Sequence, residues 1–189
     1  ASILEPFIHK GVKVIDLSAD FRLNNPAEYE SWYETEHPCP EYLQDAVYGL
    51  PELHESQISQ AKLIASPGCY ATASILALAP IVDSGILDGD IIIDAKSGVS
   101  GAGRSASLKT NFSEVNENVS AYSTDGHRHL PEIMQEIELL NKGINLKTTM
   151  LTHLIPITRG IIVSCYVNLA NKDSGIYTQK EINQIYKDF

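Results

Sequence analysis

The feature that most constrains the fold is one continuous stretch that predicts a strand, a sharp turn, a helix and a second strand. Residues 63–65 are apolar and run into a Ser-Pro-Gly turn at 66–68. Residues 70–82 have the length and composition of a helix. Residues 90–95 (DIIIDA) are apolar almost throughout, which is typical of a central strand. Strands that alternate with helices predict an α/β or α+β chain.

The rest of the chain continues this pattern. Further strands are predicted at 12–17, 148–155 and 160–169, and further helices at 27–33, 131–141 and 178–186. We expect the last two strands to pair antiparallel through the connection at 156–159. The remainder of 24–51, which holds several prolines and aromatic residues, is expected to be irregular.

Composition excludes several classes of protein. The chain has 189 residues, enough for one domain or slightly more, and 43% of them are hydrophobic, enough for a sizeable core. A net charge of −10 without basic runs argues against nucleic acid and anionic membranes as partners. No apolar run reaches the roughly 18 residues of a membrane span. Three widely spaced cysteines without a CxxC pair argue against a disulfide framework and a structural metal site, so we expect a soluble protein of a reducing compartment.

Cys69 is the candidate nucleophile. It follows the 66–68 turn at the start of a predicted helix, where amide N–H groups lack partners and the helix dipole is positive. That setting favours the thiolate, which is the form used in covalent catalysis, and the same N–H groups can stabilise an oxyanion. The alternative is a buried structural cysteine, which is how we interpret Cys165. Cys39, between two prolines, also lacks the helix-start setting.

His127 and His129 are the candidate acid/base residues, directly before the helix that Pro131 opens. In an extended segment both rings would point the same way. A histidine titrates near neutrality, so one of them can activate Cys69 or pass a proton to a hemithioacetal oxygen. Two alternatives stay open: a metal-ligand pair, for which no third ligand is evident nearby, and a pair of solvated loop histidines.

A glycine-rich loop at 97–104 (SGVSGAGR) follows the predicted central strand. Its G-x-x-G-x-G spacing differs from the dinucleotide-binding G-x-G-x-x-G, and no convincing amphipathic helix follows it. We interpret it as a loop whose glycines let a ligand approach the backbone closely. Arg104 and Arg159 can each clamp a phosphate or carboxylate with a planar guanidinium, and the alternative for each is a surface arginine.

Six segments together resemble the N-acetyl-gamma-glutamyl-phosphate reductase family, within the semialdehyde dehydrogenase superfamily. They occur in the family's order and cover most of the chain, from about residue 12 to 167. The segments are IDLSADFRL (15–23), VYGLPEL (47–53), LIASPGCYATASILALAP (63–80), SGVSGAGR (97–104), HRHLPEI (127–133) and LIPITRGI (154–161). One such motif would be suggestive, whereas six in order are specific.

The resemblance implies an NADPH-dependent reduction of N-acetyl-glutamyl 5-phosphate to the 5-semialdehyde, with phosphate release, in arginine biosynthesis. Cys69 would attack the acyl phosphate and leave a thioester, which hydride from NADPH would reduce. His127 would be the acid/base, with His129 as the alternative or as a substrate contact. Further substrate contacts would be Arg104 and Arg159, and the cofactor contacts would be Ser97, Gly98, Ser100, Gly101 and Gly103.

It also implies how the chain is organised. Residues 1–65 would be the last part of an NADP-binding Rossmann domain, and residues 66–189 a mixed-sheet catalytic and dimerisation domain of the glyceraldehyde-phosphate-dehydrogenase-like type. The family's glycine-rich nucleotide loop is absent from the sequence, so we expect an internal piece of a longer enzyme that turns over poorly alone. We expect a cytoplasmic homo-oligomer, dimer or tetramer, with a small-molecule substrate.

Other functions compete with this one. The near alternatives are a paralogous reductase of lysine biosynthesis, acting on an aminoadipyl phosphate or a carrier-bound substrate, and aspartate-semialdehyde dehydrogenase. A cysteine hydrolase would use water in place of hydride as the acceptor of the thioester. A non-catalytic interaction domain would have an ordinary thiol at Cys69.

Overall fold

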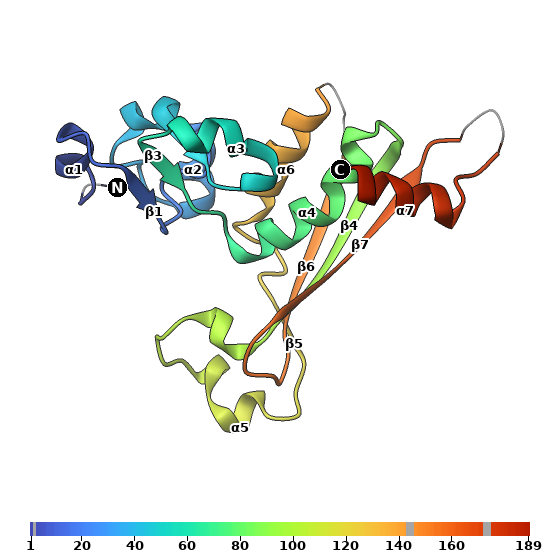
Figure 1. Ribbon diagram of the computed structural model, residues 1–189. Coiled ribbons are helices and arrows are strands. Elements are labelled where there is room, and N and C mark those ends of the chain that lie inside the picture. Colours follow the sequence, from blue (N-terminus) through green and yellow to red (C-terminus); the bar gives the residue numbers. More distant parts are fainter. Residues whose placement is uncertain (2, 143–145, 172–174) are drawn as a thin grey trace. The chain divides into compact units, whose positions relative to one another are not determined.

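The computed structural model describes residues 1, 3–142, 146–171 and 175–189, and it divides into two compact units, Ala1–Thr72 and Ala73–Phe189 (Figure 1). The helices are α1 (Glu5–His9), α2 (Pro26–Tyr33), α3 (Pro51–Gln60), α4 (Cys69–Asp83), α5 (Phe112–Val115), α6 (Leu130–Leu140) and α7 (Gln179–Asp188), with 3-10 turns η1 (Pro40–Asp45), η2 (Val99–Ala102) and η3 (Leu108–Thr110). The strands are β1 (Val14–Asp16), β2 (Ala46–Tyr48), β3 (Leu63–Ala65), β4 (Leu87–Ser97), β5 (Ser120–Tyr122), β6 (Thr148–Leu154) and β7 (Ile161–Leu169). The α/β class predicted from the sequence is confirmed.

The first unit is built on a three-stranded parallel sheet in the order β1-β3-β2. Parallel strands need crossover connections: α2 and η1 connect β1 to β2 across the position of β3, and α3 connects β2 to its neighbour β3. The central strand β3 pairs on both sides, with Leu63 opposite Val14 in β1 and Ala46 in β2. The buried core packs around it, from Val14, Phe21, Cys39, Leu43, Leu63 and Ala65.

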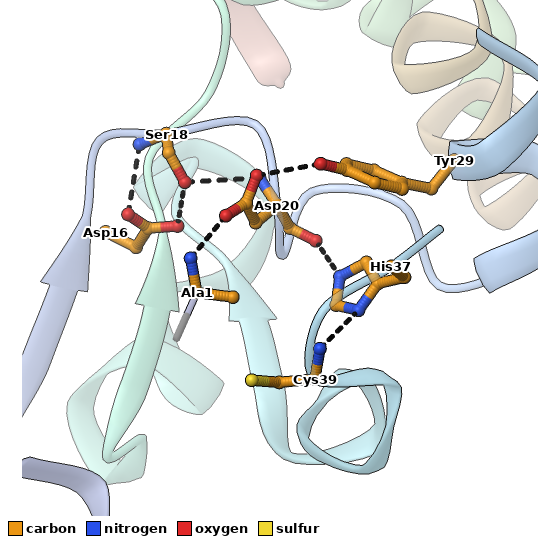
Figure 2. A network of polar contacts seen from close by, with 7 residues as sticks. All are labelled: Ala1, Asp16, Ser18, Asp20, Tyr29, His37 and Cys39. Carbon is orange, nitrogen blue, oxygen red and sulfur yellow. Dashed lines mark hydrogen bonds and ion pairs between the residues drawn. The ribbon is translucent and has the colours of Figure 1, made fainter. Parts of the chain in front are cut away.

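A polar network fixes the turn that follows β1 (Figure 2). The buried Asp16 accepts hydrogen bonds from the backbone N–H and the hydroxyl of Ser18, at 3.0 and 2.6 Å. The Tyr29 hydroxyl donates to Asp20 at 2.9 Å, and burial followed by this bond raises the pKa of Tyr29 to about 12. His37 bonds through Nε2 to the Asp20 carbonyl at 2.6 Å. These hydrogen bonds therefore hold the IDLSADF segment at the carboxyl end of β1.

The second unit is built on a mixed sheet in the order β5-β6-β4-β7. One face of β4 is buried under helices, because Ile91, Ile93 and Ala95 have no exposed surface. Ile75 of α4 and Ile133 and Ile137 of α6 are equally buried and complete this core. Helix α7 joins it through a hydrogen bond from the Tyr186 hydroxyl to the Ala77 carbonyl at 2.6 Å.

The pairing predicted for the last two strands is wrong. Both strands exist, but β4 lies between them, parallel to β6 and antiparallel to β7. The connection at 155–160 passes across the end of β4 and forms hydrogen bonds with it. Ile155 N–H donates to the Ser97 carbonyl at 3.0 Å, and Gly98 N–H donates to the Gly160 carbonyl at 2.9 Å. The prediction that β4 is a central strand is confirmed.

The other face of this sheet is exposed, and we call it the open sheet face. Its large apolar side chains are Ile92, Leu151, Ile162 and Tyr166, which are 48%, 40%, 59% and 59% exposed. Polar side chains lie on the same face, where Asp94 forms an ion pair with Lys96 and its Oδ1 lies 3.4 Å from Nδ1 of His153. The strand therefore alternates between faces, and its apolar sequence does not mean burial on both sides.

Two segments expected to be irregular or left unassigned are ordered. The 24–51 region contains η1 and β2 besides the predicted α2, and α3 follows directly. Helix α3 begins with Pro51, which suits a first helical position. None of its residues is buried, so it lacks the apolar stripe by which a helix is found in a sequence.

Candidate active site

Cys69 is the first residue of α4, and its side chain is exposed. The turn before the helix is closed by Thr72, whose N–H and hydroxyl both donate to the Gly68 carbonyl, at 2.8 and 3.0 Å. The other two cysteines differ from Cys69. Cys39 is buried, and burial raises the pKa of the half-buried Cys165 to about 11. Of the three thiols, Cys69 is therefore the most accessible to a solute.

The turn that presents Cys69 is anchored to β1 by hydrogen bonds. Ser66 N–H donates to the Asp16 carbonyl at 2.8 Å, which extends the β1–β3 ladder by one residue. The Arg22 Nε donates to the Ser66 carbonyl at 2.8 Å, and its Nη2 donates to the Leu17 carbonyl at 3.2 Å. Arg22 was not predicted to have a role. The motif IDLSADFRL marked its segment, but nothing local connects residue 22 with residue 66.

His127 lies in the turn before α6 and contacts His129. The two ring centroids are 4.7 Å apart at an interplanar angle of 68°, because the segment turns instead of running extended. The backbone N–H of His129 donates to Nδ1 of His127 at 3.1 Å. Burial, with a smaller contribution from the charge of Arg128, lowers the pKa of His127 to about 4. At neutral pH the ring is therefore uncharged and carries its proton on Nε2.

The glycine-rich loop is joined to the 155–160 connection by backbone hydrogen bonds. Val99 and Ser100 N–H donate to the carbonyls of Ile157 and Thr158, at 2.9 and 3.0 Å. Within η2, Gly101 N–H donates to the Gly98 carbonyl at 3.1 Å. The SGVSGAGR and LIPITRG motifs thus form one local structure, and these amides are committed within the protein instead of pointing to a ligand.

The three glycines of this loop have different reasons to be glycine. A Cβ on Gly98 would lie 2.9 Å from backbone atoms of Ile157 and Arg159, and a Cβ on Gly101 would lie 2.5 Å from Ser97 Oγ. Gly103 has a φ of +81° and open space beside it. Internal packing therefore requires the first two, and the backbone at Gly103 is the part of the loop that a ligand can approach.

The predicted site residues fall in both units. Cys69 belongs to Ala1–Thr72, whereas His127, His129, Arg104 and Arg159 belong to Ala73–Phe189. Within the second unit the structure brings the loop that ends at Arg104 against the connection that carries Arg159, and both arginines are exposed.

Comparison with protein families decides the family. Residues 69–189 match the family described as "Semialdehyde dehydrogenase, dimerisation domain", and residues 1–61 match "Semialdehyde dehydrogenase, NAD binding domain". The chain belongs to the semialdehyde dehydrogenase family. The assignment agrees with the resemblance drawn from the six motifs, and it shows that the family's nicotinamide-binding and dimerisation parts are both represented in the chain.

Three curated relatives of the chain are named N-acetyl-gamma-glutamyl-phosphate reductase. The protein of Dehalococcoides mccartyi strain 195 is 47% identical over 189 residues, 100% of this chain and 54% of its own length. That of Heliobacterium modesticaldum is 50% identical over 186 residues, 96% of this chain and 52% of its own. That of Geobacillus sp. WCH70 is 52% identical over 180 residues, 94% of this chain and 52% of its own length. The chain thus spans about half the length of these relatives.

Solved structures show the same fold. Aspartate semialdehyde dehydrogenase II from Vibrio cholerae superposes with a TM-score of 0.65 at 18% identity, over 99% of this chain and 56% of that one. Aspartate semialdehyde dehydrogenase with NADP from Candida albicans superposes with a TM-score of 0.62 at 14% identity, over 99% of this chain and 51% of that one. None of the helices in the described part of the chain is long and apolar enough to cross a membrane.

Proposed function

We propose that the protein is an NADPH-dependent N-acetyl-gamma-glutamyl-phosphate reductase of arginine biosynthesis. The observation that carries the proposal is the identity of 47–52%, spread over nearly the whole chain, with relatives of that name. The exposed cysteine at the start of α4 supports it, because reduction of an acyl phosphate through a thioester needs an accessible thiol there.

Cys69 begins the reaction in this proposal. Its sulfur attacks the carbonyl carbon of the acyl phosphate, and the bond from that carbon to the phosphate oxygen breaks. Phosphate leaves with the electron pair, and the acyl group stays on sulfur as a thioester. The anchored turn from Ser66 to Thr72 holds the sulfur at one place relative to the parallel sheet, which favours attack from one direction.

His127 acts as a hydrogen-bond donor in this proposal. A ring whose pKa lies near 4 is a poor acceptor for a thiol proton, which argues against a role as the base for Cys69. Its Nε2–H is suited to donate to the substrate oxygen that gains negative charge in the tetrahedral adducts. His129, whose N–H fixes this tautomer, is proposed to contact the substrate.

The match of residues 1–61 to the family's NAD binding domain supports a nicotinamide cofactor, and NADPH is the form that we propose. When bound, NADPH supplies the hydride that reduces the acyl group. Open space beside the backbone of Gly103 and the exposed side chain of Ser100 support cofactor contacts at these two residues. Gly98, Gly101 and Ser97 act indirectly, by setting the shape of the loop.

The remaining assignments follow the family. We propose that residues 1–65 are the end of the nucleotide-binding domain and 66–189 the catalytic domain, in a cytoplasmic homo-oligomer. The exposed apolar residues of the open sheet face support pairing of two copies there. The exposed Arg104 and Arg159 are proposed to hold the phosphate or carboxylate of the substrate.

Steady-state kinetics of the full-length gene product test the reaction. We expect NADPH oxidation with N-acetyl-glutamyl phosphate to exceed that with aspartyl or aminoadipyl phosphate. Cys69→Ser should abolish turnover, whereas Cys165→Ser, at a thiol that burial keeps protonated, should retain it. Preference for another acyl phosphate, or hydrolysis without nicotinamide, would overturn the proposal.

A further inference from the structure

His37 is a buried histidine of the first unit that takes no part in the proposed reaction. Its side chain is 3% exposed, although it lies in irregular backbone between α2 and η1. The rings of Phe21 and Tyr29 pack edge-on against it, with centroids 5.8 and 4.7 Å from its own. This packing restricts the rotation of the imidazole, so its two nitrogens point in defined directions.

Both ring nitrogens of His37 form hydrogen bonds with backbone groups (Figure 2). Nε2 lies 2.6 Å from the Asp20 carbonyl oxygen, and the Cys39 N–H donates to Nδ1 at 3.2 Å. A carbonyl oxygen only accepts and an amide N–H only donates, so these partners select the neutral ring with its proton on Nε2. His37 thus donates to the turn that follows β1, from a position 17 residues later in the chain.

The turn that receives this hydrogen bond is the one that carries Arg22. It closes through the Arg22 N–H, which donates to the Ala19 carbonyl at 3.3 Å. Asp20 lies inside this turn, so the bond from His37 fixes the backbone two residues before Arg22. The Arg22 Nε then donates to the Ser66 carbonyl at 2.8 Å, in the turn that presents the nucleophile. A series of contacts therefore runs from the buried imidazole to the backbone at Ser66, all within the first unit.

The loop at 17–25 forms neither helix nor strand, so no regular backbone ladder holds Arg22 in place. We propose that His37 is a positioning residue for Cys69. It acts through its hydrogen bond to Asp20, which holds the backbone that carries Arg22. The inference rests on the proposed function, in which the Cys69 sulfur must meet the acyl carbon from one direction. Displacing a reacting atom by about 1 Å lowers a rate by on the order of a hundredfold.

Two substitutions separate the two hydrogen bonds of the ring. The amide of glutamine reaches the Nε2 position and can donate to Asp20, whereas the shorter asparagine can replace only Nδ1 as the acceptor. In the full-length enzyme, with NADPH and N-acetyl-glutamyl phosphate, His37→Asn should lower kcat by at least about tenfold and leave both KM values within about twofold of wild type. His37→Gln should keep about half or more of the wild-type kcat. The matched control, His9→Asn at an exposed histidine of α1, should leave kcat unchanged.

Hydrogen exchange tests the same contacts without turnover. Peptides that cover 63–72 should exchange faster in His37→Asn than in wild type or His37→Gln, while peptides of α3 exchange as in wild type. Arg22→Gln should have the same effects on kcat and on the exchange of 63–72. Adding His37→Asn to Arg22→Gln should change neither quantity further, because one residue acts through the other.

A wild-type kcat in His37→Asn overturns the inference, as does an equal loss in His37→Gln or a loss that adds to that of Arg22→Gln. Failure of His37→Asn to fold also overturns it, because the residue would then have only a structural role. If the full-length protein reduces no acyl phosphate, the proposed function fails, and the hydrogen-exchange comparison decides this inference by itself.

Discussion

Replacing Gly101 by alanine tests the packing of the glycine-rich loop. The added Cβ would lie 2.5 Å from Ser97 Oγ, closer than a carbon and an oxygen can approach. Ser97 is 4% exposed, and its hydroxyl donates to the Gly98 carbonyl at 2.9 Å. The serine side chain must therefore rotate away, and it has little room in which to do so.

The cost follows from what the rotation breaks. Losing a buried hydrogen bond costs about 0.5–1.5 kcal/mol, and an off-rotamer side chain costs a similar amount, so Gly101→Ala should destabilise the second unit by about 1–3 kcal/mol. With a denaturant slope of about 2 kcal/mol per molar, the urea midpoint should fall by roughly 0.5–1.5 M.

Urea unfolding should be followed together with hydrogen exchange in β4 and β7 peptides, so that the unit 73–189 is measured separately. The double variant Ser97→Ala/Gly101→Ala should recover most of the loss, because the nearest remaining atom of residue 97 is Cβ, at 3.8 Å. The Gly98 carbonyl still accepts from the N–H of residue 101 in that variant. A wild-type midpoint for Gly101→Ala, or a double variant no more stable than the single one, would refute this account.

Other features of the structure make further predictions. Iodoacetamide at neutral pH should label Cys69 before Cys165, whose pKa burial raises to about 11; equal rates in peptide mass spectra would contradict the assignment. His127 should titrate by NMR near pH 4 instead of 6.5. Because folding keeps this ring neutral, the protein should lose stability as pH falls from 6.5 towards 4, and His127→Gln should lose less over that window. Gly49→Ala would place Cβ 2.9 Å from the Ala65 carbonyl oxygen, and should lower the free energy of unfolding by about 1–3 kcal/mol, as followed by the fluorescence of the single tryptophan.

The elements with a strong local pattern were predictable from the sequence. The strand at 63–65 has the predicted bounds, and the helix predicted at 70–82 is α4. Strand pairing was not predictable in the same way. β6 and β7 follow one another with a short connection, which favours a hairpin, but the long strand β4 pairs with both. That choice depends on which strand supplies the larger apolar face, and a local pattern does not contain this information.

In the candidate site, too, local features were predictable and contacts between distant residues were not. Cys69 was found because a cysteine after a turn at a helix start has a recognisable chemistry, and the structure confirms its position in α4. The proximity of the His127 and His129 rings depends on a turn where an extended segment was considered. The contact of Arg22 with Ser66 had no signal at all, because it joins positions 44 residues apart in sequence.

The hydrogen bonds that anchor the Cys69 turn to the segment after β1 have a practical consequence for making chimeras of this protein with its relatives. The Asp16 carbonyl and the Arg22 side chain form hydrogen bonds with the backbone of Ser66. The position of the Cys69 sulfur therefore depends on a segment more than 40 residues earlier in the chain. A chimera whose crossover falls anywhere from residue 23 to residue 62 takes Asp16 and Arg22 from one parent and the turn at Ser66 from the other. Exchanges that move residues 15–72 as a single block keep both partners of these hydrogen bonds from the same parent.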